Sequence, residues 1–288
     1  MPATASFEVQ PPRDTPHGSP QPADSGPHTV NLAYERTGSG APLLLLHGIG
    51  HHHQAWDPVR HVLAAERDVI AVDLPGFGTS PALPSEFTYD AVTVASVLDA
   101  FCRSLGIERP HVAGNSLGGL LALELGRRGR ARSVTALSPA GFWTERERAY
   151  AFGTLRAMRL GALALPLPLI DRLSRSGPGR AALTSTIYAR PGRRSPEAVV
   201  AETLALRNAT GFEETLAVGR EAGFRHDVAE VPVAIAWGTK DRILLRRQGV
   251  RAKRTIPGAR LVRLPGCGHV PMNDDPALVS RVILDTSR

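Results

Sequence analysis

Short apolar segments alternate with helical patterns along most of this chain, and this alternation limits its possible folds more than any other feature. The segments 42–47 (PLLLLH) and 69–72 (VIAV) are almost continuously apolar, as expected for strands that are buried on both faces. Residues 54–65 and 117–128 carry apolar side chains at intervals of three and four, which indicates amphipathic helices. Strands separated by helices predict a mostly parallel sheet with helices on both faces.

Further segments extend the same pattern. We expect five more strands, the first of them at an edge of the sheet, at 29–34, 111–114, 134–137, 233–237 and 261–264. Two more helices are expected at 89–105 and 276–284. Between residues 139 and 231 no segment reads as a strand, and 149–173, 196–208 and 212–223 look helical. This insertion predicts a helical cap over the carboxyl edge of the sheet, with an unrelated helical domain as the alternative.

The predicted organisation has three parts. Residues 1–28 are rich in Pro, Ser, Thr and Gly and are expected to form a flexible tail without the apolar segment of a signal peptide. Residues 29–140 and 231–288 form the α/β core, and residues 141–230 form the helical cap. The chain has 288 residues, 42% of them hydrophobic, so its core needs no disulfide or metal for stability.

The chain is basic, with a formal net charge of +7. The densest stretch, residues 242–263, contains no acidic residue, and we interpret it as a solvated helix face rather than an anion-binding surface. No nucleic-acid-binding motif accompanies it, so no nucleic-acid partner is expected. No apolar run reaches the roughly 18 residues that a membrane-spanning helix needs, which favours a cytoplasmic protein without membrane insertion. We expect a monomer or a homodimer.

A serine follows one of the predicted strands at a position suited to a nucleophile. The sequence Gly114-Asn115-Ser116-Leu117-Gly118 fits the pattern G-x-S-x-G and lies directly between a strand and a helix. A nucleophile on such a tight turn is held in strained backbone and needs very small neighbours two residues away. The amino end of the following helix directs unpaired N–H groups and partial positive charge at the same point. The segment therefore predicts Ser116 as a nucleophile.

A second segment supplies hydrogen-bond donors. His47-Gly48-Ile49-Gly50 ends a buried strand, and its backbone could face the same edge of the sheet as Ser116. Backbone N–H groups stabilise an oxyanion with little reorganisation, and removing one such donor raises the barrier by about 3–4 kcal/mol. We assign the oxyanion hole to the backbone N–H groups of Ile49 and Leu117. His47 is expected to support this loop through hydrogen bonds rather than to react.

Two later strands end in a carboxylate and an imidazole. Asp241 follows the strand at 233–237, and His269 follows the strand at 261–264 within the glycine-rich segment Gly266-Cys267-Gly268. A serine needs a histidine to take its proton, and a carboxylate on the other ring nitrogen fixes the tautomer of that histidine. The order Ser116, Asp241, His269 is the order expected for this architecture. We predict these three residues as a catalytic triad. Cys267 is interpreted as a small loop residue rather than a reactive thiol.

Taken together, these segments resemble the α/β-hydrolase superfamily over about residues 29 to 288. The matching segments are LLLLHGIG, VIAVDLPGFGTSP, HVAGNSLGGLLAL, VAIAWGTKDRIL and LPGCGHVPMNDDP. The resemblance implies an eight-stranded, mostly parallel sheet with a helical cap between strands six and seven, and a reaction that needs no cofactor. A serine at position 116 speaks against epoxide-hydrolase and haloalkane-dehalogenase relatives, which carry aspartate there.

The favoured function is that of a serine hydrolase, resembling carboxylesterases, which cleaves an ester or similar activated carbonyl compound of a small, largely apolar substrate through an acyl-enzyme. The alternatives are a carbon–carbon bond hydrolase of a meta-fission-type dienoic acid, a lactonase or haloperoxidase-like hydrolase, and a non-catalytic ligand-binding module. The carbon–carbon hydrolases usually carry Trp after the catalytic histidine, where this chain has Val270, and they use a cap arginine, for which Arg190 is the candidate.

The cap is expected to contribute to substrate binding. Its first helical segment carries Phe152, Leu155 and Met158, which we expect to line a hydrophobic pocket, with packing on the core as the alternative. His51, His52 and His53 follow the oxyanion loop, but successive side chains point in different directions and no cluster has metal-ligand spacing. They are interpreted as polar loop residues at the pocket mouth, and no metal site is predicted.

Overall fold

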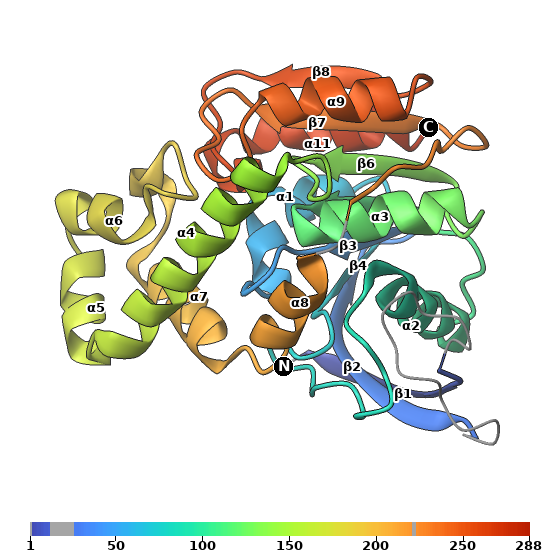
Figure 1. Cartoon of the computed structure of the whole chain (residues 1–288), viewed down its shortest axis with the longest axis horizontal. Helices are drawn as coiled ribbons and strands as arrows, with labels where there is room; N and C mark the ends of the chain where they lie inside the picture. Colours follow the sequence, from blue (N-terminus) through green and yellow to red (C-terminus); the bar gives the residue numbers. More distant parts are fainter. Residues whose placement is uncertain (1, 12–25, 221–222) are drawn as a thin grey trace.

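Eight strands form one sheet in the order β1-β2-β4-β3-β5-β6-β7-β8 (Figure 1). The computed structural model describes residues 2–11, 26–220 and 223–288. The strands, in chain order, are β1 Ala3–Val9, β2 His28–Thr37, β3 Pro42–Leu46, β4 Asp68–Val72, β5 His111–Asn115, β6 Ser133–Leu137, β7 Val233–Gly238 and β8 Arg260–Leu264. Pairings β1–β2 and β2–β4 are antiparallel and all others are parallel. The expected eight-stranded, mostly parallel sheet is therefore confirmed.

Side chains that alternate along the central strands build a core on each face of the sheet. In β3, Leu44 and Leu46 pack into one hydrophobic cluster, whereas Leu43 and Leu45 pack into the other, as the period of two in a strand requires. The helices α2 Ala91–Ser104, α3 Leu117–Arg127 and α9 Arg247–Thr255 contribute to the first cluster. The second cluster contains residues of α1 Asp57–Ala64 and α11 Pro276–Thr286. Both faces of the parallel strands are thus covered, as their continuous apolar sequence predicts.

The prediction of a flexible tail over residues 1–28 is wrong for its first part. Residues 3–9 form β1, which pairs along its whole length with β2. Ala5, Phe7 and Val9 are buried and alternate with exposed residues, so this segment carries the period-two pattern of a half-buried strand. Residues 12–25 of the predicted tail lie outside the described residues. Because β1 forms the edge, β2 is an interior strand and the expectation of an edge strand at 29–34 is also wrong.

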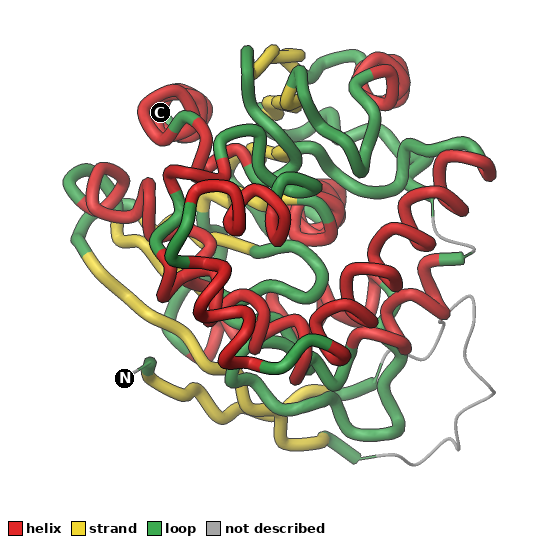
Figure 2. The backbone as a smooth tube through the Cα atoms, turned by 90° about the vertical axis from the view of Figure 1, so that its left-hand side faces the viewer, coloured by secondary structure: helices red, strands yellow, loops and turns green. Residues whose placement is uncertain are grey.

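Five helices lie between β6 and β7 in the chain: α4 Glu145–Ala164, α5 Leu167–Ser174, α6 Gly177–Thr184, α7 Pro196–Asn208 and α8 Phe212–Gly219. The helix expected over 149–173 is divided in two, because Pro166 cannot continue an α-helix. Figure 2 looks onto the end of the molecule where α5 and α6 lie, and helices stand in front of the strands over much of that view. Shorter elements are the 3₁₀ segments His53–Trp56 and Pro191–Arg193 and the helix α10 Pro271–Asp274.

The basic stretch at 242–263 is only partly a solvated face. Arg247 and Arg251 of α9 form ion pairs with Glu147 of α4, whose side chain is 3% exposed. Arg251 also donates to the backbone oxygen of Phe142 at 2.6 Å. These contacts join the first inserted helix to the core.

Across the parts of the chain that the structure describes, none of the helices has both the length and the apolar character needed to cross a membrane.

Candidate active site

Ser116 stands at a sharp turn between β5 and α3. Its φ of 57° and ψ of −115° lie in a region that non-glycine residues rarely adopt. The turn is held on both sides, because the Ser116 N–H donates to the Leu137 oxygen at 3.0 Å and the Ser116 oxygen accepts from Leu120 N and Ala140 N. The sequence between strand and helix therefore folds into the strained turn that was expected for a nucleophile.

The small residues around this turn are required by close backbone contacts. A Cβ atom on Gly114 would lie 2.0 Å from the Gly118 oxygen, and one on Gly118 would lie 2.2 Å from the Leu46 oxygen. Neither position has room for a side chain, since real Cβ atoms do not approach backbone oxygens so closely. The two glycines that flank Ser116 thus let α3 pack directly on the ends of β5 and β3.

Asp241 and His269 are in contact, as the sequence predicts. Asp241 Oδ2 lies 2.9 Å from His269 Nδ1, and the carboxylate side chain is fully buried. The other carboxylate oxygen accepts from the backbone N–H groups of Ile243 and Leu244, both at 2.9 Å. These bonds fix the carboxylate plane. With Nδ1–H donated to Asp241, Nε2 of a neutral imidazole is left as an acceptor.

Ser116 and His269 line the same cavity, although no hydrogen bond joins their side chains among the described residues. Hydrogen bonds of this kind are often long in a free enzyme and tighten when substrate binds. The backbone of β5 and the histidine loop are nevertheless connected. Asn115 Nδ2 donates to the backbone oxygens of His269 at 2.9 Å and Leu137 at 3.1 Å. Asn115 therefore positions the histidine loop against the turn that carries Ser116.

A buried aspartate that the sequence analysis did not single out also holds this loop. Asp274 accepts from the backbone N–H groups of Gly268 at 2.7 Å, Ala189 at 3.0 Å and Arg190 at 2.7 Å. It thereby joins the histidine loop to the inserted segment. The N-cap of the last helix, α11, is the neighbouring Asp275, which accepts from Leu278 N at 3.0 Å.

The oxyanion loop is oriented by His47. Leu74 N–H donates to His47 Nε2 at 2.9 Å, so the ring proton lies on Nδ1, which donates to the Gly48 oxygen at 2.7 Å. Burial lowers the pKa of His47, which keeps the ring neutral. In a trans peptide the N–H points away from the carbonyl oxygen. With the Gly48 oxygen bound to His47, the Ile49 N–H points the opposite way, and His47 supports the loop as predicted.

The two expected donors are placed suitably for one oxyanion. Ile49 and Leu117 both line a cavity that Ser116 also lines. Among the described residues neither N–H has a hydrogen-bond acceptor, and Leu117 lies in the first turn of α3, where helix N–H groups have no partner within the helix. The structure therefore brings these donors to the serine, and their assignment to an oxyanion hole stays a prediction.

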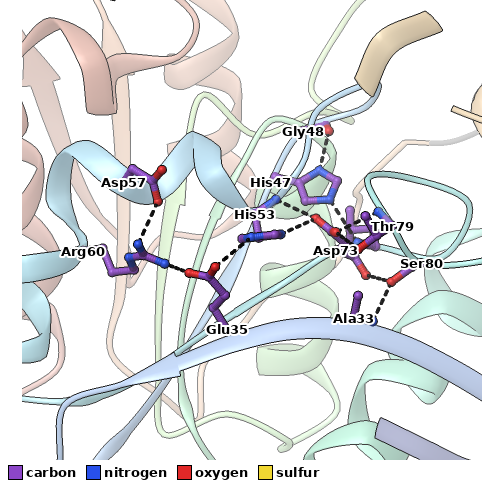
Figure 3. A network of polar contacts seen from close by, with 11 residues as sticks. Ala33, Glu35, His47, Gly48, His53, Asp57, Arg60, Asp73, Thr79 and Ser80 are labelled. Carbon is purple, nitrogen blue, oxygen red and sulfur yellow. Dashed lines mark hydrogen bonds and ion pairs between the residues drawn. The ribbon is translucent and has the colours of Figure 1, made fainter. Parts of the chain in front are cut away.

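Beside the oxyanion loop lies a buried network centred on Asp73, at the end of β4 (Figure 3). Asp73 Oδ1 accepts from His53 N at 2.7 Å and contacts His53 Nδ1 at 2.9 Å, and Oδ2 accepts from Thr79 N at 2.9 Å and Thr79 Oγ1 at 3.0 Å. Burial alone would raise the pKa of Asp73, but the hydrogen bonds that the carboxylate accepts from His53 and Thr79 hold it well below its usual range. The network fixes the segments that follow β3 and β4.

The buried Asp73 network predicts how the free energy of unfolding depends on pH. The folded-state pKa of Asp73 lies below its unfolded value of about 4, so the carboxylate stabilises the fold above that pH and loses its contribution as the pH falls toward the folded-state pKa. We expect Asp73→Asn to unfold at lower urea concentration than wild type at pH 7. The difference in unfolding free energy should shrink by about 1 kcal/mol between pH 5 and pH 3. Urea titrations of both proteins at several pH values measure this difference. A difference that does not change with pH would contradict the lowered pKa of Asp73.

Two cavities meet at Ser116. The first is here called the polar cavity because the polar residues His51, Ser116, Glu202 and His269 line it, together with the apolar Met158, Ile187 and Leu206. The second, the apolar cavity, is lined by Leu117, Leu120, Trp143, Phe152, Leu216 and Leu244 beside Ser116. Leu155 and Ile49 line both. Each has a volume of about 60 Å³, room for a group of a few heavy atoms. Phe152, Leu155 and Met158 therefore line cavities that Ser116 also lines, and their role in substrate binding stays a prediction.

Other predicted residues are placed differently. Arg190 is exposed, lines neither cavity, and donates through Nη1 to the Asp274 backbone oxygen at 3.1 Å. The three histidines after the oxyanion loop are buried rather than exposed at a pocket mouth, because His53 binds Asp73 and His51 lies beside Tyr188. Burial raises the pKa of the Cys267 thiol to about 12, so it stays protonated. Within the described ranges, no group of three or more metal-ligating side chains is gathered in one place.

The fold and the site together define a class of α/β proteins. Its features are an open, mostly parallel sheet, a serine on a strained strand-to-helix turn, and a histidine–aspartate pair beside that serine. A sequence profile described as the Alpha/beta hydrolase family matches residues 43–282, and the chain belongs to that family.

Known proteins of several kinds resemble the chain. An uncharacterized protein of Mycobacterium tuberculosis (strain ATCC 25618 / H37Rv) is 29% identical over 87% of this chain and 76% of its own length. The epoxide hydrolase EphH of the same strain is 33% identical over 62% of this chain and 86% of its own length. Among solved structures, a thermophilic esterase from Thermogutta terrifontis is 25% identical with a TM-score of 0.69, and covers 89% of this chain and 93% of that one.

Proposed function

We propose that the protein is a serine hydrolase, carboxylesterase-like in its chemistry, that cleaves an ester or similar activated carbonyl bond of a small substrate through an acyl-enzyme. The observation that carries the proposal is the buried contact between Asp241 Oδ2 and His269 Nδ1 at 2.9 Å, made by a histidine that shares a cavity with Ser116. Since a carboxylate on Nδ1 leaves Nε2 able to accept a proton, His269 has the tautomer that a general base needs.

The reaction follows from these positions. Ser116 Oγ attacks the carbonyl carbon while His269 Nε2 takes the hydroxyl proton, and the oxyanion that forms is bound by the N–H groups of Ile49 and Leu117. When the tetrahedral intermediate collapses, the bond to the alcohol breaks and His269 gives its proton to the leaving oxygen. Water then attacks the acyl-enzyme by the same route, with His269 as base, and releases the acid and the free serine.

Each of the two cavities is expected to bind a different part of the substrate. The leaving oxygen must lie next to His269, because that residue protonates it, and His269 lines the polar cavity but not the apolar one. The alcohol portion of an ester therefore occupies the polar cavity. The acyl portion occupies the apolar cavity, where Phe152 of the cap helix α4 meets Trp143 at a centroid distance of 5.6 Å. The small volume of both cavities favours short substrates.

The alternative functions have less support. A carbon–carbon hydrolase of a dienoic acid would need a cation in the cap to bind the substrate carboxylate, and Arg190 does not reach either cavity. The similarity to an epoxide hydrolase does not change the proposal, because position 116 is a serine. A cytoplasmic location and a monomeric or homodimeric state stay predictions from the sequence.

Covalent labelling tests this proposal. We expect a fluorophosphonate to form one adduct per chain, on the peptide that contains Ser116, and to abolish hydrolysis of 4-nitrophenyl acetate and butyrate, because the probe reacts with an activated serine. Mass spectrometry of the digested protein locates the adduct. Ser116→Ala should neither react with the fluorophosphonate nor hydrolyse these esters. Ser85→Ala, a change at an exposed serine, should react with the probe and hydrolyse the esters as wild type does. Hydrolysis by Ser116→Ala at the wild-type rate would refute the proposed nucleophile.

A further inference from the structure

A buried polar cluster lies beside the polar cavity, which two of its members, His51 and Glu202, line. Glu202 of α7 accepts from Tyr188 Oη at 2.7 Å and Arg194 Nε at 2.5 Å, and a second contact from Arg194 completes an ion pair. All of these bonds go to one carboxylate oxygen, Oε1. His51 Nε2 lies 3.4 Å from the Tyr188 hydroxyl, at the side of the oxyanion loop. Tyr188 is 1% exposed, and His51, Arg194 and Glu202 are 8% exposed.

The second oxygen of Glu202 is buried without a partner. Glu202 Oε2 is shielded from solvent and makes no hydrogen bond with any described residue. Leaving a buried acceptor of this kind unpaired is unfavourable, most of all for a charged group, so such atoms in folded proteins usually have a partner. Glu202 also lines the cavity that Ser116 and His269 line. A hydrogen-bond donor on a ligand bound in this cavity would supply the missing partner.

We propose that the leaving group of the substrate carries a hydrogen-bond donor, a hydroxyl or an amide N–H, that binds the Glu202 carboxylate in the polar cavity. This inference rests on the proposed function, which places the alcohol portion of the ester beside His269. The substrate is then an ester of an apolar acyl group with a hydroxyl- or amide-bearing alcohol, such as a partial ester of a small diol.

The charges of the cluster favour a neutral donor over a cation. Arg194 already forms a buried ion pair with Glu202, so the pair has no net charge to offer an ammonium group. Burial and the nearby Arg194 lower the pKa of His51 well below its usual range, so His51 adds no charge. A cationic substrate would have to lose its hydration without a net counter-charge, whereas a hydroxyl needs only the one acceptor.

Among the residues that the structure describes, the apolar cavity offers no comparable group. Its polar lining residue Thr215 already donates its hydroxyl proton to the Gly211 oxygen at 2.6 Å. A donor on the acyl portion would therefore meet mostly hydrophobic side chains. This difference between the two cavities places the polar group on the alcohol side of the scissile bond.

Two esters of the same acid test the inference: 2-hydroxyethyl butyrate and propyl butyrate, whose leaving groups have the same number of heavy atoms. We expect wild type to favour the hydroxyethyl ester. The ratio of kcat/KM for the two esters should fall at least about tenfold in Glu202→Met, the range expected for a lost hydrogen bond to a charged group. When this ratio is compared between variants, differences in the intrinsic reactivity of the two esters and in the fraction of folded protein cancel.

Two further variants keep the test interpretable. Glu202→Met leaves Arg194 buried without its partner, so the double variant Glu202→Met/Arg194→Met removes both charges and should show the same fall in the ratio. Thr215→Val changes the apolar cavity and should leave the ratio as in wild type. If the ratio is the same in wild type and both Glu202 variants, the inference is overturned and the proposed function stands. If wild type cleaves no ester and Ser116 is unreactive, the proposed function fails and the inference fails with it.

Discussion

Asp241→Asn is expected to lower kcat for ester hydrolysis by about 10⁴-fold while the protein stays folded. The asparagine can keep its oxygen on the N–H groups of Ile243 and Leu244, which bind Oδ1 in the wild type. Its NH₂ group then replaces Oδ2 opposite His269 Nδ1, 2.9 Å away. An NH₂ group can only donate there, so Nδ1 becomes the acceptor and the ring proton moves to Nε2. The imidazole is then unable to take the proton of Ser116.

The matched control is Asp285→Asn, the same change at an exposed carboxylate of α11 whose ion-pair partner is Arg288. It should leave kcat and KM unchanged. Steady-state kinetics with 4-nitrophenyl butyrate measure both variants, and circular dichroism establishes that each is folded. If Asp241→Asn lost activity only in proportion to the unfolded fraction, the carboxylate would be a structural residue. A retained KM with a greatly reduced kcat is the result that its positioning role requires.

Much of this fold follows from local patterns in the sequence. The leucines of β3 and the glycines around Ser116 predict a buried parallel strand and a strained turn, because each pattern permits few conformations. The contact of Asp241 with His269 could be predicted because parallel strands end at the same edge of the sheet. The predictable features were therefore those indicated by a local sequence pattern or by the geometry of a parallel sheet.

Features that neither a local pattern nor the geometry of a parallel sheet indicates could not be predicted. The strand β1 was obscured by the proline-rich composition of the segment after it, and its burial depends on pairing with β2 across an intervening segment. Arg190 was a candidate substrate ligand only through the resemblance to carbon–carbon hydrolases, and its guanidinium is bound to the Asp274 backbone. Glu202 had no signal at all, since an acidic residue in a predicted helix is most often solvated. Only the arrangement of α7 beside the oxyanion loop brings it to the cavity.

The second large effect is expected on stability, from Gly118→Ala. The new Cβ would lie 2.2 Å from the Leu46 oxygen and 2.6 Å from the His47 oxygen, both of them backbone atoms that cannot rotate away. Either α3 or the end of β3 must move, so we expect the free energy of unfolding to fall by about 3 kcal/mol or more. The melting temperature should fall by roughly 10 °C. Calorimetry or urea unfolding measures the change.

A glycine without such neighbours provides the comparison. Gly153 lies at an exposed position in the middle of α4, and a Cβ there would meet nothing within 4 Å. Gly153→Ala should raise the free energy of unfolding by about 0.5–1 kcal/mol, because alanine favours the helix and restricts the unfolded chain. Opposite signs for the same substitution would show that the contact of α3 with β3, rather than glycine content, determines the effect. Equal destabilisation by both would contradict the close approach that holds Ser116 beside the Ile49 loop.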